Sequence, residues 1–358
     1  GFGLSYAIAA ARNKLRKPRD LTYEEYVVNR FGRKIYETVF KSYAEKVWGD
    51  PAQLDAELAR TRIAVTSLFA LAKRMVVGES GGRETTARQF YYPRNGIIGM
   101  SERMARKVEE KGGSIVLNAE ARRLECDGNR VQSVEYTAKG GGVKKIGADF
   151  VVSTIPVGLL VKTIKPPAPA GVKMAASGLR YRSLILLYVA FKRDRLFDYN
   201  WIFYPDKAVP FNRASEQKGF SESMVPKGRT VLCLEMTCTE GDARWNSSDK
   251  QIFDLAMEGV EKTGLARRDE VLEYFTVRLK NVYPVYDLGF RRNLDAVVGW
   301  LDGFENLLTN GRGGLFNYNN TDHCIDMGIA AARHVSEARG KQSWLAERKR
   351  FDSYLIVD

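Results

Sequence analysis

The chain has 358 residues, and 56 lysines and arginines against 43 aspartates and glutamates give it a formal net charge of +13. Hydrophobic residues at 44% and charged residues at 28% are typical of a globular protein and exclude a disordered or collagen-like chain. No uncharged apolar run approaches the roughly 18 residues that a membrane-spanning helix needs, and no secretory signal pattern opens the chain. Four cysteines are too few for a disulfide framework, so we expect a reducing, cytoplasmic location.

The positive charge is dispersed along the chain rather than gathered in blocks of like charges. We therefore expect a small-molecule partner and no nucleic acid. A polyanionic cofactor or a sugar nucleotide would also benefit from the positive potential. The sequence leaves contact with a membrane surface and the oligomeric state open.

The first part of the chain is predicted to be helical. Thr22 and Glu25 have the spacing of a capping box, which begins a helix. Gly49-Asp50-Pro51 ends it, because proline cannot continue the hydrogen-bond ladder. A second helix is expected over residues 54–77. The apolar stripe of the first helix recurs every four residues, at Val27, Phe31, Ile35, Val39, Tyr43 and Val47.

Residues 90–156 alternate a helix with short strands. In chain order we expect a helix with Met100, Met104 and Val108 on one face that ends near Gly112, strands at 114–117 and 130–136, a glycine hairpin turn at 140–142, and a strand at 149–155. The last strand is short, apolar and β-branched, which is typical of a strand buried on both faces.

Longer strands follow a proline-rich link at residues 166–172. The expected elements are strands at 183–191, 230–238 and 273–280, a helix that begins near Asp249, a buried strand at 306–309, and a helix from about Asp322 to Arg339 that Gly340 terminates. This order predicts a mixed α/β chain whose parts interleave in space.

Several common chemistries are absent from the sequence. Two histidines and the lack of a Cys-x-x-Cys pair predict no metal site. There is no Gly-x-Ser-x-Gly nucleophile elbow and no phosphate-binding Walker A loop. Gly1-Phe2-Gly3 begins a Gly-x-Gly-x-x-Gly pattern, but Tyr6 stands at its last glycine. The catalytic residues therefore remain unknown from sequence.

The segment 306–332 carries the best candidate site. It reads as a buried strand, a glycine-containing turn, a polar loop and a helix. Glycines in the turn let backbone approach a ligand closely, and Arg312 offers a fork of donors. Asn320 is a competent helix cap, and the helix start would present free N–H groups to an anion or to an electron-rich ring edge. An ordinary capped helix after a loop is the alternative.

The stretch NGRGGLFNYNNTDHCIDMG, residues 310–328, resembles the C-terminal flavin-binding motif of a flavoprotein superfamily. That superfamily includes protoporphyrinogen oxidase, the flavin amine oxidases, the phytoene desaturases and UDP-galactopyranose mutase. The spacing of Arg312 and Tyr318 matches the mutase branch. Four more segments resemble the superfamily in the same order, namely 23–49 with its Tyr-Ala-Glu-Lys-Val-Trp-Gly ending, 90–124, 148–156 and 281–290.

The resemblance implies a glutathione-reductase-like, FAD/NAD(P)-binding α/β domain interleaved with an α+β substrate domain. It divides the chain into 1–85 (helical, substrate domain), 86–165 (FAD domain), 166–300 (substrate-domain sheet), 301–340 (strand, loop and helix at FAD) and a tail. The glycine fingerprint that opens these families is not in the sequence, so the cofactor domain is expected to be incomplete and the chain alone to bind FAD poorly. The implied FAD-binding residues are Gly311, Arg312, Gly313, Asn320, Thr321, Asp322 and Met327.

The resemblance implies an FAD-dependent oxidoreductase that transfers hydride from an organic substrate to the flavin. One alternative is a mutase that isomerises a sugar nucleotide with reduced flavin, in which Arg312, Tyr283 and Tyr318 hold the diphosphate. Tyr-Asn-Asn-Thr stands at 318–321 where the mutases have Tyr-Tyr-Asp-Met, which places this alternative second. An inactive fragment is the third. The expected substrate contacts are Trp48, Tyr283 and Tyr318.

Overall fold

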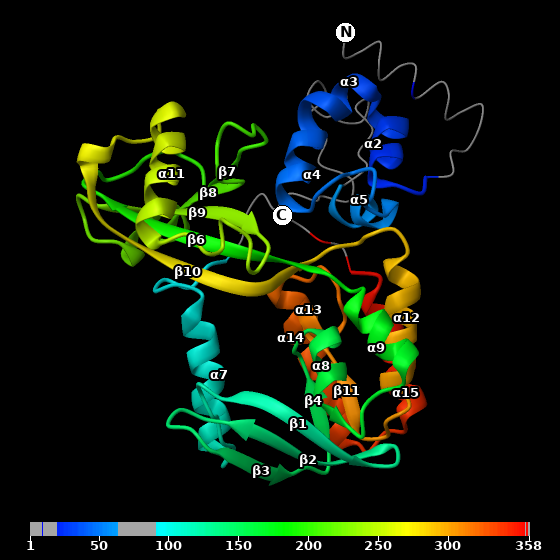
Figure 1. Cartoon of the computed structure of the whole chain (residues 1–358). Coiled ribbons are helices and arrows are strands. Elements are labelled where there is room, and N and C mark those ends of the chain that lie inside the picture. Colours follow the sequence, from blue (N-terminus) through cyan, green and yellow to red (C-terminus); the bar gives the residue numbers. More distant parts are fainter. Residues whose placement is uncertain (1–8, 10–19, 64–90, 355, 357–358) are drawn as a thin grey trace, which may run out of the picture.

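The computed structural model describes residue 9, residues 20–63, residues 91–354 and residue 356 (Figure 1). Its described strands form a five-stranded sheet in the order β10-β6-β9-β8-β7, a four-stranded sheet in the order β3-β2-β1-β5, and a parallel pair, β11-β4. The two larger sheets lie at opposite ends of the molecule, with the β11-β4 pair beside the smaller one (Figure 1). This is the mixed, interleaved α/β arrangement that the sequence predicts.

The strands are β1 (Glu120–Asp127), β2 (Arg130–Thr137), β3 (Val143–Gly147), β4 (Val151–Ser153), β5 (Ile164–Lys165), β6 (Tyr181–Phe191), β7 (Trp201–Phe203), β8 (Arg213–Glu216), β9 (Thr230–Cys238), β10 (Val271–Pro284) and β11 (Leu307–Thr309). The longer helices are α2 (Tyr23–Phe31), α4 (Lys41–Val47), α5 (Ala56–Arg62), α7 (Ile98–Glu110), α8 (Val157–Thr163), α9 (Ala170–Ser177), α11 (Asp249–Lys262), α12 (Phe290–Leu301), α14 (Thr321–Ser336) and α15 (Lys341–Phe351). Shorter ones are α3 (Arg33–Ile35), a π-helical turn (Tyr36–Phe40), α10 (Gln217–Phe220), two 3₁₀ turns (Glu222–Met224 and Arg268–Glu270) and α13 (Gly311–Gly314).

The first predicted helix is divided into several pieces. The capping box is present, since Thr22 Oγ1 accepts from the Glu25 N–H at 3.1 Å and the Glu25 carboxylate accepts from the Thr22 N–H at 3.2 Å. Gly32, with φ of 86°, interrupts the helix, and a π-helical turn then widens the spiral. A stripe spaced every four residues cannot stay on one face across such a break. The predicted stripe is therefore wrong at Val39, which is 48% exposed.

Other sequence predictions need correction at their edges. Residues 114–117 form no strand, because they pair with no strand among the described residues. β4 is not buried on both faces, since Val152 is 43% exposed and β11 is the only strand among the described residues that pairs with β4. Gly340 does not terminate α14, because α14 ends at Ser336. Gly340 instead precedes α15, a helix that lies in the segment predicted to be a tail. Of the helix predicted over 54–77, α5 is described, and residues from 64 on lie outside the described part.

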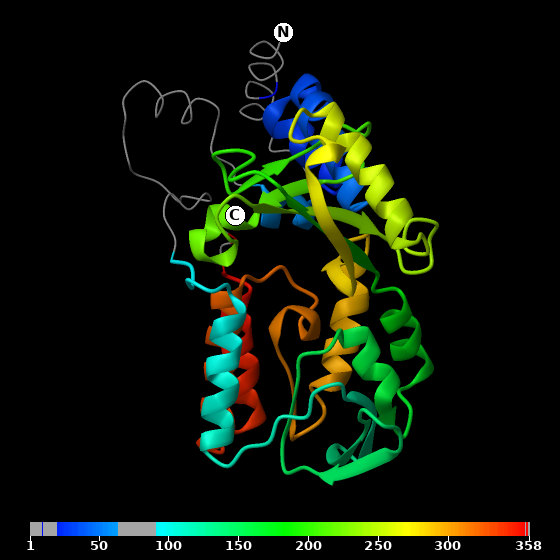
Figure 2. The ribbon, with the colours of Figure 1, turned by 90° about the vertical axis from the view of Figure 1, so that its left-hand side faces the viewer.

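The five-stranded sheet has two different faces. Helix α11 packs on one face, against apolar residues such as Ile185, Leu234 and Met236. The cross-strand pairs of the opposite face include Leu186 with Glu235, and that face is turned toward α4. The long strand β10 continues from this sheet toward the lower half of the molecule (Figure 2). The face that carries Glu235 is therefore turned toward α4, and β10 connects the sheet to the elements below it.

One half-buried cation, Lys46, connects the helical part to the loop that precedes β8. The ammonium of Lys46 lies 2.6–3.0 Å from four backbone carbonyl oxygens, those of Tyr204, Asp206, Val209 and Phe211. An ammonium has three donors and one charge, so it is shared among these acceptors, of which the Asp206 oxygen also accepts the N–H of Val209. This contact fixes the distance between α4 and the sheet.

No helix in the parts of the chain that the structure describes is long and apolar enough to cross a membrane.

Replacing Lys46 with Met keeps the length of the side chain but removes the donors. The carbonyls of the loop then lose a charged partner, so we expect the free energy of unfolding to fall by about 2–4 kcal/mol in urea titrations. Lys207→Met is the matched control, because Lys207 is 62% exposed and pairs only with Glu45 on the surface. Its loss should cost at most about 1 kcal/mol. Equal effects of the two variants would contradict the role given to Lys46.

Candidate functional site

The hydroxyl of Tyr318 joins three distant parts of the chain. It accepts a hydrogen bond from the indole N–H of Trp48 at 2.8 Å and donates one to the carbonyl oxygen of Pro284 at 2.5 Å. Trp48 caps the end of α4, Pro284 ends β10, and Tyr318 lies in the loop before α14. Both aromatic residues are almost fully buried. The structure thus brings together two of the three residues predicted to contact substrate.

The third predicted residue, Tyr283, lies in the same group. Its ring is 6.4 Å from that of Tyr318 and nearly parallel to it. On the other side of Trp48, the ring of Tyr43 is 6.0 Å away and edge-on, and it also meets Phe203 at 5.7 Å. We refer to Tyr43, Trp48, Tyr283 and Tyr318 as the aromatic cluster.

Arginines surround the aromatic cluster. The guanidinium of Arg312 lies 5.1 Å from the Tyr318 ring and 5.3 Å from the Tyr283 ring, and that of Arg62 lies 5.4 Å from the Tyr318 ring. Such cation–π contacts favour a partly desolvated arginine. Arg312 is also held by the backbone, because it donates to the carbonyl oxygens of Val282 and Asn319 at 3.2 and 3.3 Å.

A paired charge completes the group. Arg213 on β8 donates from two nitrogens to one carboxylate oxygen of Glu235 on β9, at 2.5 and 2.8 Å. Both residues act electrostatically on Tyr283 and on Tyr43. The other oxygen of Glu235 is buried and has no partner among the described residues. Among the residues that the structure describes, Arg62, Arg213, Arg312 and Glu235 are the charged side chains that act on Tyr283.

The tyrosine hydroxyls of the aromatic cluster are neutral donors. Burial raises the pKa of Tyr318, although Arg62 and Arg312 act in the opposite direction. Burial also raises the pKa of Tyr283, where Glu235 adds to the effect. Both hydroxyls therefore stay protonated across the physiological range. Tyr318 already donates its proton to Pro284, so Tyr283 is the one of the two that can donate a hydrogen bond to an oxygen of a ligand.

The predicted glycine turn is present as α13, and packing within the chain explains two of its glycines. A Cβ on Gly313 would lie 2.9 Å from the Thr154 carbonyl oxygen, and one on Gly314 would lie 2.8 Å from that of Ser153. Only glycine permits α13 to sit this close to the end of β4. Gly311 adopts a φ of 70°, which also favours glycine.

The other predicted cofactor contacts lie at the start of α14. Asn320 caps the helix in a reciprocal pair with His323, and its N–H donates to the ring Nδ1 of His323 at 3.1 Å. Thr321 and Asp322 are exposed in the first turn, where a helix presents free N–H groups. Met327 is fully buried in a core cluster with Leu308 and Trp344, and its sulfur accepts a hydrogen bond from Asn319 just before the helix.

Buried polar atoms without partners gather between β11 and α14. They are Thr309 Oγ1, Asn310 Oδ1 and Asn319 Oδ1, each with no hydrogen-bond partner in the part of the chain that is described. The side-chain amides of both asparagines donate to Met327, one to its backbone oxygen and one to its sulfur, so the two lie together. Since buried polar groups are almost always satisfied, these atoms fit a polar ligand seated at the helix start.

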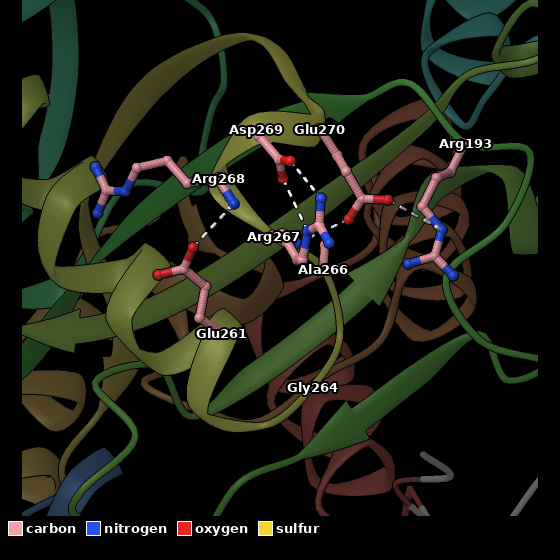
Figure 3. Close-up of a pocket in the computed structure, with 8 residues that line it drawn as sticks. All are labelled: Arg193, Glu261, Gly264, Ala266, Arg267, Arg268, Asp269 and Glu270. Carbon is pink, nitrogen blue, oxygen red and sulfur yellow. Dashed lines mark hydrogen bonds and ion pairs between the residues drawn. The ribbon is translucent and has the colours of Figure 1, made fainter.

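A separate surface hollow lies beyond α11, and Figure 3 shows the residues that line it. Its charges are already paired: Arg267 with Asp269, Arg193 with Glu270, and the backbone N–H of Arg268 with Glu261. It contains none of the predicted site residues. This hollow is an exposed ion-pair network rather than a reaction site.

The sequence did not point to Tyr43, Arg62, Arg213 or Glu235 as site residues. Glu235 carried a usable signal, because it interrupts the apolar run of β9, and a charge in a buried strand needs a partner. Arg213 carried no signal of its own, since arginine is common in half-exposed strands. Its place in the site comes from its pairing with Glu235 across β8 and β9.

Comparison with known proteins agrees with this architecture. The sequence model of the family described as flavin containing amine oxidoreductase matches residues 12–290. A solved structure of reduced UDP-galactopyranose mutase is similar at a TM-score of 0.77 and 20% identity, covering 93% of this chain and 70% of that chain. A protein assigned as a protoporphyrinogen oxidase from Exiguobacterium sp. is similar at a TM-score of 0.66 and 16% identity, covering 94% of this chain and 72% of that chain. A triple mutant of putrescine oxidase is similar at a TM-score of 0.59 and 13% identity, covering 94% of this chain and 74% of that chain. The likenesses confirm the predicted fold class.

Removing the Tyr318 hydroxyl as Tyr318→Phe should destabilise the fold. The Trp48 N–H and the Pro284 carbonyl would both stay buried without a partner, at a cost of about 1–3 kcal/mol in the free energy of unfolding. A double-mutant cycle with Trp48→Phe should give a coupling energy of at least about 0.5 kcal/mol.

Tyr274→Phe is the matched control, because the Tyr274 hydroxyl bonds to none of the described residues while its ring stacks on Phe253. That variant should unfold at nearly the same urea concentration as the parent. Additive effects of the Tyr318 and Trp48 changes would contradict a shared hydrogen bond.

Proposed function

Because the chain belongs to the family of flavin containing amine oxidoreductases, we propose that it is an FAD-dependent oxidoreductase whose substrate carries negative charge. The observation that carries the substrate class is the excess of arginine around the aromatic cluster. Arg213 and Arg312 both act electrostatically on Tyr283, and of these two Arg213 is the one bonded to the Glu235 carboxylate. A cationic amine would be repelled here, whereas a carboxylate or phosphate would gain charge-assisted hydrogen bonds.

FAD is the cofactor of this family, and the unpaired polar atoms between β11 and α14 fit it. Asn310 and Asn319 would hold polar edges of the flavin, and the start of α14 would favour its negative charge. When bound, FAD supplies hydride transfer chemistry, or in its reduced form a nucleophile.

The residues of the chain bind and orient the substrate. Arg312, fixed by two backbone carbonyls, would hold an anionic group without losing much conformational freedom. The Tyr283 and Tyr318 rings flank that guanidinium and exclude water from one side of it. Exclusion of water strengthens each electrostatic contact with the substrate.

A second candidate is isomerisation of a sugar nucleotide by reduced flavin. The observation that favours it is the stacking of Arg312 against Tyr283 and Tyr318, which together could bind a diphosphate. Two arginines, Arg213 and Arg312, are close enough to act on the same tyrosine. This candidate shares the site with the first and differs in the reaction.

The reaction is tested on FAD-reconstituted protein with two substrates. Oxygen-dependent peroxide release with protoporphyrinogen, which carries carboxylates, would support the oxidoreductase and exclude the mutase. Conversion of UDP-galactopyranose that needs prior reduction of the flavin would support the mutase and exclude the oxidoreductase. Turnover of a simple amine and of neither anionic substrate would contradict the substrate class.

Anion binding by the aromatic cluster can be measured without any cofactor. We expect calorimetric titration with UDP to give an affinity that Arg312→Gln weakens by about tenfold or more, since each charged hydrogen bond contributes about 1.5–3 kcal/mol. Arg312→Lys keeps the charge but lacks the planar guanidinium, so its affinity for UDP should lie between those of the parent and of Arg312→Gln. Arg106→Gln removes an exposed arginine of α7 as the control. Equal affinities in Arg312→Gln and Arg106→Gln would refute the proposed anion site.

Asn319→Leu tests the residues offered to FAD. The substitution removes a buried oxygen that has no described partner, so the protein without FAD should melt at the same temperature or higher. The rise in melting temperature on adding FAD should shrink, and so should the flavin absorbance retained after gel filtration. If FAD raises the melting temperature of this variant as much as that of the parent, Asn319 does not contact FAD. No response in the parent chain would agree with the sequence expectation that it binds FAD poorly.

A further inference from the structure

A second basic pocket lies beside the aromatic cluster, between α4, the loop before β8 and the ends of the inner strands β6 and β9. Its volume is about 510 Å³. Four basic and two acidic side chains line it, namely Lys46, Arg182, Lys207, Arg244, Glu45 and Asp242. No residue in this pocket belongs to the predicted site.

Internal contacts already occupy most of these charges. Lys207 pairs with Glu45, and Lys46 is surrounded by the four carbonyl oxygens described above. The Asp242 carboxylate accepts the N–H groups of Thr239 and Trp245 at 2.7 and 2.8 Å. The two arginines are therefore the charges that remain available to a ligand.

Arg182 and Arg244 form no ion pair with any residue in the described ranges. Each has one neutral hydrogen bond: Arg182 donates to Thr239 Oγ1 at 2.7 Å, and Arg244 donates to the Thr237 carbonyl oxygen at 3.3 Å. The Nε of Arg182 is buried and has no described acceptor. A buried guanidinium donor without an acceptor is costly, and an anion is the ligand that would satisfy it.

The two arginines act on each other as like charges. Burial lowers the pKa of Arg182, Cys238 and Asp242 raise it, and Arg244 and Arg180 lower it. Asp242 acts on Arg182 without bonding to it, so an anion bound between the two guanidinium groups would further reduce their repulsion. A cationic or purely apolar ligand would leave that repulsion in place.

We propose that Arg182 and Arg244 form a second oxyanion site, which binds a phosphate-type group. The site rests on residues of its own and goes beyond the proposed function. It adjoins the aromatic cluster, because Arg182 faces Tyr283 in the register of β6 with β10, and Asn212 of the pocket precedes Arg213. The phosphate-type group comes either from a substrate that spans both sites or from a free anion.

The test is calorimetric titration of the full chain with inorganic pyrophosphate at low ionic strength, where charge attraction is least screened. It is carried out in the Arg312→Gln background, so that the aromatic cluster contributes little. Arg182→Gln and Arg244→Gln should each weaken binding by about tenfold or more, the loss of a charge-assisted contact. Arg182→Lys keeps the charge but lacks the Nε donor, so its affinity for pyrophosphate should lie between those of the background and of Arg182→Gln. Arg106→Gln should bind as the background does. Unchanged far-ultraviolet circular dichroism and melting temperature establish that each variant is folded.

Pyrophosphate affinities of folded Arg182→Gln and Arg244→Gln equal to that of Arg106→Gln would overturn the proposal. The source of the anion is read from UDP in the otherwise unchanged chain. If one ligand spans both sites, Arg182→Gln and Arg312→Gln each weaken UDP; if the anion is free, only Arg312→Gln does. If Arg312→Gln leaves the affinity for UDP unchanged, the proposed function is wrong. The pyrophosphate affinities still decide whether the second site exists.

Discussion

The Tyr318 hydroxyl is the interaction on which the arrangement of the site depends. Its two hydrogen bonds connect Trp48 of the helical part, Pro284 at the end of β10 and the loop before α14. These segments are far apart in sequence, and a pair of bonds through one atom fixes all three at once. The aromatic rings and the arginine that stacks on them keep their mutual distances because this oxygen holds their backbones together.

The charge of the site is maintained by the two-faced sheet. Residues that alternate along β9 put Leu234 and Met236 under α11 and Glu235 on the opposite face. A buried glutamate is unfavourable unless paired, so Glu235 requires Arg213 beside it. Arg213 is held toward the aromatic cluster as a result. The strand therefore keeps its hydrophobic contribution to stability on one face and one half of the Arg213–Glu235 ion pair on the other.

The sequence predicts those elements that local patterns encode. The strands β6, β9 and β10, the helices α7 and α11 and the capping box at Thr22 follow from periodicity and caps, and they are confirmed. The expectations for 114–117 and for the stripe through Val39 are wrong, because a strand also needs a partner and a helix also needs an unbroken register. The resemblance to flavoproteins anticipated Trp48, Tyr283 and Tyr318 together. No local pattern encodes Arg62 or Arg213, whose contacts are made across the fold.

The segment 309–320 packs closely against the end of β4, and it also carries buried side-chain oxygens that have no partner among the described residues. Gly313 and Gly314 are needed because β4 lies against them, a constraint of packing that would exist without a ligand. The side-chain oxygens of Asn310 and Asn319 have the opposite character: nothing described in the fold uses them, and their burial costs stability. Their amide nitrogens bond to Met327, whereas their Oδ1 atoms have no partner among the described residues. The glycines of this motif thus serve the packing of the chain, and the unpaired Oδ1 atoms are the ones that we propose to hold FAD.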